Sequence, residues 1–488
     1  MTRLYTNIYN FIRCRIFSYL MLILLNACIE KDVYQPPDEE NSGIEYVSYL
    51  YPYSNEVMNV VSDIIIETND EVDPARIKTE IPVLKYNKSW LFMLTQDDCK
   101  HAAYSTTWAV INGKPLSKNY YYGTEQLAAG DLPPDVFNLE KTLGSTDGAG
   151  NEVRFAFTTT VSPEWDWMDD VTEVKRGFTN NYYRFHMKKG LTWNNLSEML
   201  TYDTGIAFHD VNTTMVNQKD SILKHFTLSQ QIILNKLQGR GCKMLAEPNG
   251  NETYTTAALN YSPIRLMTAE RSSSAGTQVV KLFPFKIDSN LSKHVILRTF
   301  YNSPYDIVSY IERQMKFDKE EREAVHVGVH ATDATFAQFL LWLNNKYGKD
   351  GDDTVWFPSM EEFYEYNYYR VQGNITRQVE KNKIKLTISL PSENYFYYPS
   401  VTINLSGIKK EQIKLITIDD KVKGFSFANY GEGIMLNIDY RRYLTELAIH
   451  FVEKYEDFRS VSNRNDALYF VKKLKDSTAK DELLKKLD

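Results

Sequence analysis

Two adjacent carboxylates follow a continuous apolar segment early in the chain. The segment 90–95 is apolar except for its final threonine, which is typical of a strand buried on both faces. Asp97 and Asp98 come almost directly after it. Parallel α/β architectures build their sites at the carboxyl ends of strands, where two acids can divide the work of binding a cation and accepting a proton. Taken alone, such a pair is more often a cap or a turn.

Histidines follow two later apolar segments in the same way. His209 comes after residues 205–208, and His330 comes after residues 324–329. A lone histidine at a strand end is usually structural. Imidazole nevertheless binds zinc-like ions, and its pKa near neutrality suits proton transfer. We therefore take His209 as a candidate ligand and His330 as a candidate general acid, and we read His326, deeper in the same strand, as structural.

The order of these residues resembles that of the polysaccharide deacetylases, the NodB-homology family. The first motif of that family is Thr-Phe-Asp-Asp-Gly at the end of the first barrel strand, and residues 95–99 here read Thr-Gln-Asp-Asp-Cys. Gln96 replaces the aromatic residue and Cys99 replaces the glycine. The resemblance implies that Asp97 is the general base and Asp98 a ligand of a divalent cation, zinc or similar.

The second family motif contains two histidines four residues apart, both of which bind the cation. His209 matches the first position, but Thr213 occupies the second. Threonine is a poor ligand for a borderline cation. Asp210 or Asn212 could supply an oxygen instead, which would favour a harder metal, so the third ligand stays open.

Two further motifs are matched in part. Residues 246–250 read Ala-Glu-Pro-Asn-Gly where the family has Arg-Pro-Pro-Tyr-Gly, so Ala246 lacks the guanidinium that orients the base. The resemblance makes Pro248 and Asn249 substrate-binding residues, although an ordinary turn explains them equally well. A late Leu-x-His motif resembles the segment ending at His330, whose ring the family uses to protonate the leaving group.

Alternating strand-like and helical segments organise the rest of the chain. They predict a parallel sheet between residues 85 and 370, and the resemblance implies a distorted (β/α) barrel. From 371 to 460 the apolar residues alternate with polar ones, which predicts a small antiparallel β-sandwich whose last strand contains residues 447–451. Residues 46–84 read as an entry segment and 461–488 as a helical tail.

The amino-terminal segment has the features of an export signal. Three arginines precede the apolar run 16–25, which is shorter than the roughly 20 residues needed to span a bilayer. The following Leu-Asn-Ala-Cys, ending at Cys28, resembles the lipobox of bacterial lipoproteins. The resemblance implies a signal peptide over 1–27, a lipidated Cys28 that anchors the chain in the outer membrane of the cell envelope, and a tether over 28–45. The acids after Cys28 favour the outer cell surface.

Charge and cysteine content limit the possible partners. The net charge of −7 falls to −10 once the signal and its three arginines are removed, and no basic block occurs in the body of the chain. Nucleic-acid binding is therefore disfavoured. Cys99 and Cys242 are the cysteines left after Cys28, and they are too few for a disulfide framework or a zinc set.

These observations predict a hydrolase that removes acetyl groups from a polysaccharide or oligosaccharide by means of metal-activated water. Asp98 and His209 would hold the cation, Asp97 would act as base and His330 as acid. The aromatic-acidic segment 164–170 could stack on sugar, or be an exposed loop with another role. One alternative is a catalytically inactive glycan-binding lipoprotein that kept the barrel, and another is an envelope structural protein.

Overall fold

The computed structural model describes residues 53, 57, 59–175, 182–186, 189–210, 216–271 and 278–488. The predicted signal, Cys28 and tether lie outside the described residues, as do Asn212 and Thr213. The predictions made for them stay predictions. Within the described part of the chain, no helix is both long and apolar enough to cross a membrane.

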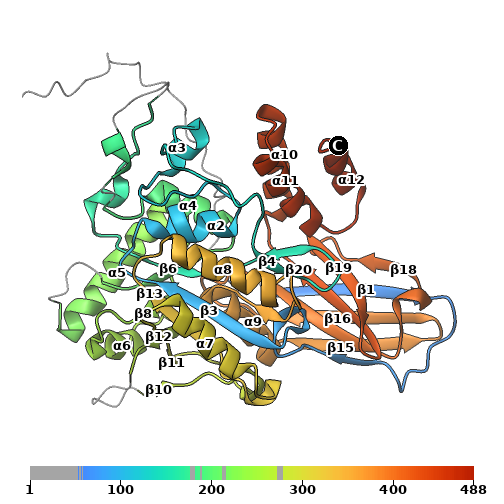
Figure 1. Ribbon diagram of the computed structural model, residues 1–488. Coiled ribbons are helices and arrows are strands. Elements are labelled where there is room, and N and C mark those ends of the chain that lie inside the picture. Colours follow the sequence, from blue (N-terminus) through green and yellow to red (C-terminus); the bar gives the residue numbers. More distant parts are fainter. Residues whose placement is uncertain are drawn as a thin grey trace, which may run out of the picture.

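A parallel sheet forms the centre of the larger α/β part (Figure 1). Its strand order is β10-β11-β9-β8-β7-β6-β3-β13-β12, and β14 pairs with β3. All of its described ladders are parallel, as the alternation of segments predicted. The strands are β3 (Trp90–Gln96), β6 (Thr158–Val161), β7 (Gly205–Phe208), β8 (Met244–Ala246), β9 (Leu266–Ala269), β10 (Val279–Val280), β11 (Val295–Leu297), β12 (Thr299–Phe300), β13 (Val325–Val329) and β14 (Val355–Trp356).

The sheet is curled, because residues 295–300 pair with strands on two different sides of the sheet. β11 pairs with β9, whereas β12 pairs with β13, and Arg298 is the single residue between these two short strands. Residues 295–300 therefore connect the two sides of the curled sheet. This arrangement brings the carboxyl ends of β3, β7, β8 and β13 toward one another.

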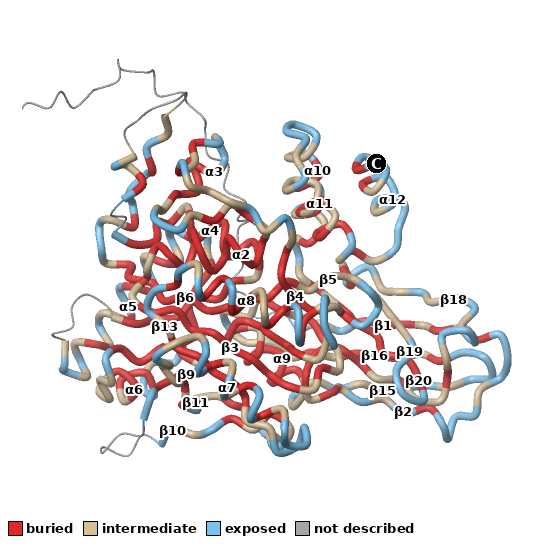
Figure 2. Tube along the Cα trace, in the orientation of Figure 1, coloured by how far each residue is buried: buried red, intermediate tan, exposed pale blue. Residues whose placement is uncertain are grey.

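Side chains alternate between the interior of the curled sheet and the helices around it. On β3, Leu91 and Met93 belong to an inner apolar cluster, and Phe92 and Leu94 belong to the outer core. Buried residues run continuously through this region (Figure 2). The surrounding helices include α2 (Ala109–Ile111), α3 (Thr124–Ala129), α4 (Trp193–Thr201), α5 (Lys219–Lys236), α6 (Glu252–Leu259), α7 (Pro304–Gln314) and α8 (Ala334–Tyr347).

Helix α9 (Met360–Gln372) packs at the amino ends of the strands. Its Glu361 accepts a hydrogen bond from the backbone of Ile206 near the start of β7, and the amide of Met360 donates to Thr158 at the start of β6. Because α9 covers this end, the opposite end of the sheet is the one available for a site.

Two antiparallel four-stranded sheets form a sandwich beside the α/β part. Their orders are β15-β16-β1-β18 and β19-β20-β17-β2, and their facing sides share one apolar core. Residues 60–80, which read as an entry segment, supply β1 and β2. The strands are β1 (Val60–Thr68), β2 (Lys78–Glu80), β15 (Asn374–Glu380), β16 (Lys383–Leu390), β17 (Ser400–Ser406), β18 (Ile413–Ile418), β19 (Gly424–Tyr430) and β20 (Gly433–Asp439).

The strand predicted at residues 447–451 is wrong, because this segment belongs to helix α10 (Leu444–Asp457). Leu444, Ala448, Phe451 and Val452 are buried at helical spacing, whereas Ile449 is 40% exposed. Helices α11 (Val461–Lys473) and α12 (Thr478–Lys485) follow it.

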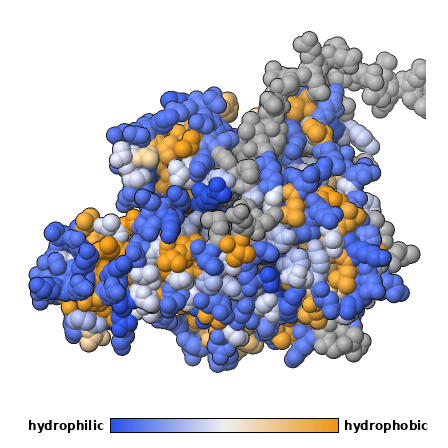
Figure 3. All heavy atoms as spheres, turned by 180° about the vertical axis from the view of Figure 1, so that it is seen from behind, coloured by the Kyte–Doolittle hydropathy of each residue, from blue (hydrophilic) through white to orange (hydrophobic). Residues whose placement is uncertain are grey.

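The rear face is mainly hydrophilic, with separated apolar patches (Figure 3). A short hairpin of β4 (Gly144–Thr146) and β5 (Glu152–Arg154) lies near β19 and β20 (Figure 1).

Candidate active site

The Asp97–Asp98 turn keeps a tight backbone although it lacks the glycine of the family motif. Asp98 and Cys99 have φ angles of 60° and 49°, in the left-handed region that favours glycine. The turn is held by the amide of Asp97, which donates to the carbonyl of Val329, and by the amide of Cys99, which donates to Thr160 Oγ1 at 3.1 Å. Cys99 and Cys242 are both buried free thiols.

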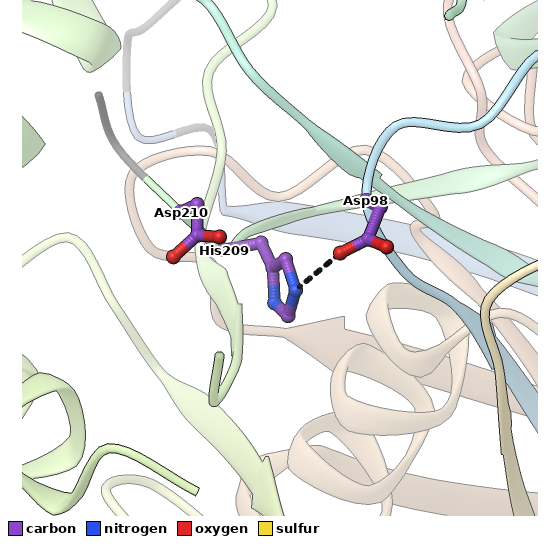
Figure 4. Close-up of side chains that lie close together, drawn as sticks. All are labelled: Asp98, His209 and Asp210. Carbon is purple, nitrogen blue, oxygen red and sulfur yellow. Dashed lines mark ion pairs between the residues drawn. The ribbon is translucent and has the colours of Figure 1, made fainter. Parts of the chain in front are cut away.

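His209, which follows β7, faces the two acids, which follow β3. Its Nδ1 donates to the carbonyl of Ala246 at 2.8 Å, which fixes the ring and leaves Nε2 directed at the acids. Nε2 lies 3.4 Å from Asp98 Oδ1 (Figure 4). It lies 3.9 Å from Asp97 Oδ2. The structure thus brings His209 to an acidic pair that lies more than a hundred positions earlier in the sequence.

His209 and the two acids favour one another's charged forms. The hydrogen bond with His209 is the largest influence on Asp98 and lowers its pKa well below the usual value. Burial alone would lower the pKa of His209, but the charge of Asp97 and the bond to Asp98 raise it overall. A negative site around an imidazole is suited to a cation.

Asp210 completes a set of three potential ligands. One ligand atom from each of Asp98, His209 and Asp210 lies within 4.8 Å of the other two, and the two acids lie on either side of the imidazole (Figure 4). Asp210 Oδ1 is buried and has no hydrogen-bond partner among the described residues, and burial raises the pKa of this carboxyl. A cation would satisfy this atom.

The spacing of these atoms also fits a divalent cation. Two ligands with bonds of about 2.0–2.2 Å at a tetrahedral angle lie roughly 3.4 Å apart. The separation between His209 Nε2 and Asp98 Oδ1 has this value. One imidazole and two carboxylates suit zinc or a harder divalent ion.

Arg298 is a site residue that was not predicted from the sequence. Its Nη1 donates to Asp97 Oδ1 at 2.6 Å, and its Nη2 donates to the carbonyl of Glu247 at 2.5 Å. Arg298 and Asp97 are both buried, at 1% exposure. The available signal was an arginine directly after the apolar residues 295–297. A buried arginine needs an anionic partner.

A family comparison adds to this geometry. The model of the family described as "Putative polysaccharide deacetylase" matches residues 62–488. This chain belongs to that polysaccharide deacetylase family. A comparison with curated proteins found no match.

The predicted acid of this deacetylase family member lies at the same end of the sheet. His330 follows β13, is exposed, and is near enough to Asp98 for its charge to contribute to the lowered pKa of that carboxyl. Its ring centroid lies 4.9 Å from that of Phe300. His326 is buried beneath it, as predicted, and its Nε2 lies 2.8 Å from Thr95 Oγ1.

The residues expected to contact substrate lie beside Asp210 of the candidate ligand set. Pro248 and Asn249 line a pocket together with Asp210, Asn217 and Asn251. Asn249 has a φ of 52°, as expected of a turn between β8 and α6. An amide side chain and a carboxyl of the candidate ligand set therefore line the same pocket.

Glu247, whose backbone carbonyl bonds Arg298, carries a further carboxyl near the site. Glu247 is buried at 2% exposure, and burial raises its pKa to about 7, against the opposing charge of Arg298. Such a shift is common in active sites.

Proposed function

We propose that this chain is a metal-dependent hydrolase that removes acetyl groups from a glycan at the carboxyl ends of the curled sheet. The observation that carries the proposal is the meeting of Asp97, Asp98 and His209 within 3.4–3.9 Å, in a member of the polysaccharide deacetylase family. The family membership supports a polysaccharide substrate. We also propose that the curled sheet is a distorted (β/α) barrel of the deacetylase type.

Each residue has a role that its surroundings support. Asp98, His209 and Asp210 would hold the cation. The chemistry that a divalent cation supplies at such a site is polarisation of a carbonyl and a lower pKa for water. Asp97 presents Oδ2 toward the same point, where it can accept a proton from water, while Arg298 holds Oδ1.

Release of the sugar requires a proton on the departing nitrogen or oxygen. His330 is exposed at the rim and follows a strand hydrogen-bonded to β3, so it can deliver that proton. Pro248 and Asn249 border the pocket beside Asp210, where an amide can bond a sugar hydroxyl. We further propose lipid anchoring through Cys28 in the outer membrane, on the grounds of the lipobox-like segment.

The second candidate function is a glycan-binding protein without catalysis. Ala246 and Thr213 replace an arginine and a histidine of the family motifs, and both replacements favour this alternative. Fold and family do not by themselves guarantee activity.

Acetate release by the full chain separates the two candidates. The wild-type protein, supplied with Zn²⁺ or Co²⁺, is incubated with N-acetylchitohexaose and with acetylated xylohexaose. We expect release of acetate from at least one of them, and a loss of about 10²–10⁴-fold in Asp97→Asn, which keeps the shape of the side chain. Asp318→Asn removes an exposed acid and serves as the control. Absence of acetate release together with measurable oligosaccharide binding would favour the binding protein.

A further inference from the structure

We propose that the loop from Ser162 to Asp170 binds a sugar ring of the glycan next to the residue that is deacetylated, with Trp165 as the stacking surface. The proposal rests on the proposed function, and it makes the substrate an oligomer that extends beyond the reacting sugar. It follows from where the loop leaves the sheet, how its aromatic residues lie, and how it is held.

The loop leaves the sheet between the two halves of the candidate site. Strand β6 lies between β3 and β7, and its last residue, Val161, pairs with Phe208, which precedes His209. One residue earlier, Thr160 Oγ1 accepts the hydrogen bond from the amide of Cys99, which follows Asp98. The loop therefore begins with Asp98 on one side and His209 on the other.

Trp167 and the backbone that follows the acids both pack on Gly190. A Cβ atom placed on Gly190 would be 2.4 Å from the Trp167 ring and 2.5 Å from the carbonyl oxygen of Cys99. The ring and the acidic turn are thus both in contact with Gly190, which has no side chain to separate them. The amide of Leu191 donates to the same carbonyl at 2.9 Å, so this contact is fixed.

Trp165 stands beside Trp167 and faces solvent. The two ring centroids are 6.4 Å apart with the planes inclined at 41°, and Trp165 is 44% exposed. A single exposed aromatic residue needs no explanation in general. Here the exposed indole is a neighbour of Trp167, which packs on Gly190 beside the backbone of Cys99, so we place Trp165 within reach of the sugar adjoining the site.

The loop is held at several points, which presents the indole in a fixed position. The carboxylate of Glu164 accepts hydrogen bonds from His225 Nδ1 at 2.8 and 2.9 Å and from Ser229 Oγ at 3.2 Å, both on α5. Met168 is fully buried, and Asp169 pairs with Lys236 at the end of α5. A surface that is already ordered loses little entropy when it binds.

The chemistry of the loop matches a sugar ring better than a charged or purely apolar ligand. An indole offers a flat apolar face of large area with few rotamers to freeze, and it also carries an N–H donor. A pyranose has a C–H face that covers such a ring and hydroxyls at its edge. We expect stacking of a sugar on the indole to change the affinity by about two- to tenfold, the order of magnitude that stacking between aromatic side chains provides.

The test compares a long substrate with a small one in the full chain. Trp165→Ala should raise KM for N-acetylchitohexaose or acetylated xylohexaose by about two- to tenfold, with little change in kcat. Hydrolysis of 4-methylumbelliferyl acetate, which is too small to reach the loop, should be unchanged. Trp165→Phe should retain most of the affinity, and Phe458→Ala, which removes another exposed ring, is the control.

A binding measurement keeps this test independent of catalysis. Calorimetric titration of Asp97→Asn with the two hexasaccharides gives a Kd, which Trp165→Ala in the same background should raise by a similar factor. An unchanged Kd, or no binding of either hexasaccharide by the parent, would overturn the Trp165 site. Binding that depends on Trp165 without acetate release from the wild type would support the site and reject the proposed hydrolysis.

Discussion

Arg298 Nη1 donates to Asp97 Oδ1 at 2.6 Å inside the curled sheet. The family motif places its arginine at the position of Ala246, which belongs to the inner apolar cluster here. Arg298 enters instead from the junction of β11 and β12, and its Nη2 bonds the carbonyl of Glu247, next to Ala246. A guanidinium therefore reaches Asp97, the proposed base, from the junction of β11 and β12 and not from the position of Ala246.

Removal of Arg298 should impair the reaction. We expect Arg298→Ala to lower kcat/KM for acetate release by about ten- to a hundredfold, because Asp97 would lose the partner that orients it. The variant should also unfold more easily, by about 3–5 kcal/mol, since it leaves a buried carboxylate unpaired. Acetate release and chemical denaturation measure the two effects.

A second-site substitution distinguishes orientation from simple destabilisation. Ala246→Arg in the Arg298→Ala background returns a guanidinium to the same region from β8, and we expect it to restore part of kcat/KM. Arg313→Ala removes an exposed arginine on α7 and should change neither quantity. Wild-type activity in Arg298→Ala would show that Asp97 needs no such partner.

Cation binding should depend on the residues grouped around His209. We expect Asp98→Asn and His209→Ala each to weaken binding of Zn²⁺ to the metal-free chain by at least about tenfold, because each removes one of few ligands. Asp210→Asn tests whether the buried, unpartnered Oδ1 is the third ligand. Calorimetry gives the affinities, with Asp318→Asn as the matched control. Undiminished zinc affinity in both Asp98→Asn and His209→Ala would place the cation elsewhere.

His326 should make stability depend on pH. Burial, reinforced by the charge of Arg298, lowers the pKa of His326 to about 3. In the unfolded chain the imidazole of His326 takes up a proton near pH 6.5, whereas in the folded chain it stays neutral until about pH 3. The folded state is therefore most stable above pH 6.5, and its stability falls as the pH decreases toward 3. Between pH 6.5 and 5 the loss from this group is about 2 kcal/mol.

Urea unfolding at several pH values tests this dependence. His326→Gln should have a smaller loss of stability between pH 6.5 and 5 than the wild type, although the lost bond to Thr95 lowers its stability overall. His294→Gln removes an exposed histidine and should leave the slope unchanged. Equal slopes in the wild type and His326→Gln would mean that His326 is protonated in the folded state.

The sequence predicted that the acidic pair and His209 lie close together, because strand ends in a parallel sheet converge at one edge, and the structure confirms this proximity. The sequence was not sufficient to predict Arg298. That side chain reaches Asp97 only because residues 295–300 join both sides of the sheet, and the two residues are 201 positions apart. A contact that depends on closure of the sheet leaves no local pattern.

Long-range pairing also explains what was missed in the sandwich. β1 pairs with β16, in a register that runs from Val60–Leu390 to Glu67–Lys383. The local sequence of residues 60–68 does not indicate which distant strand they pair with. In α10 the local pattern was ambiguous, because Leu447, Ile449 and Phe451 alternate like a strand. The helix forms because its buried face is made by Leu444, Ala448, Phe451 and Val452 against the outer core.

Asp466 on α11 connects the carboxy-terminal helices to the α/β part. Its carboxylate is buried and accepts hydrogen bonds from Arg154 Nη1 at 2.7 Å and from Tyr202 at 2.8 Å, and it also pairs with Lys114. We expect Asp466→Ala to destabilise the chain by about 3–5 kcal/mol, because two buried cations lose their partner. Proteolysis and thermal unfolding should show α11 becoming accessible first. Asp481→Ala, an exposed acid on α12, should be neutral, and a comparable loss in that control would mean that the effect of Asp466 is not due to its buried pairs.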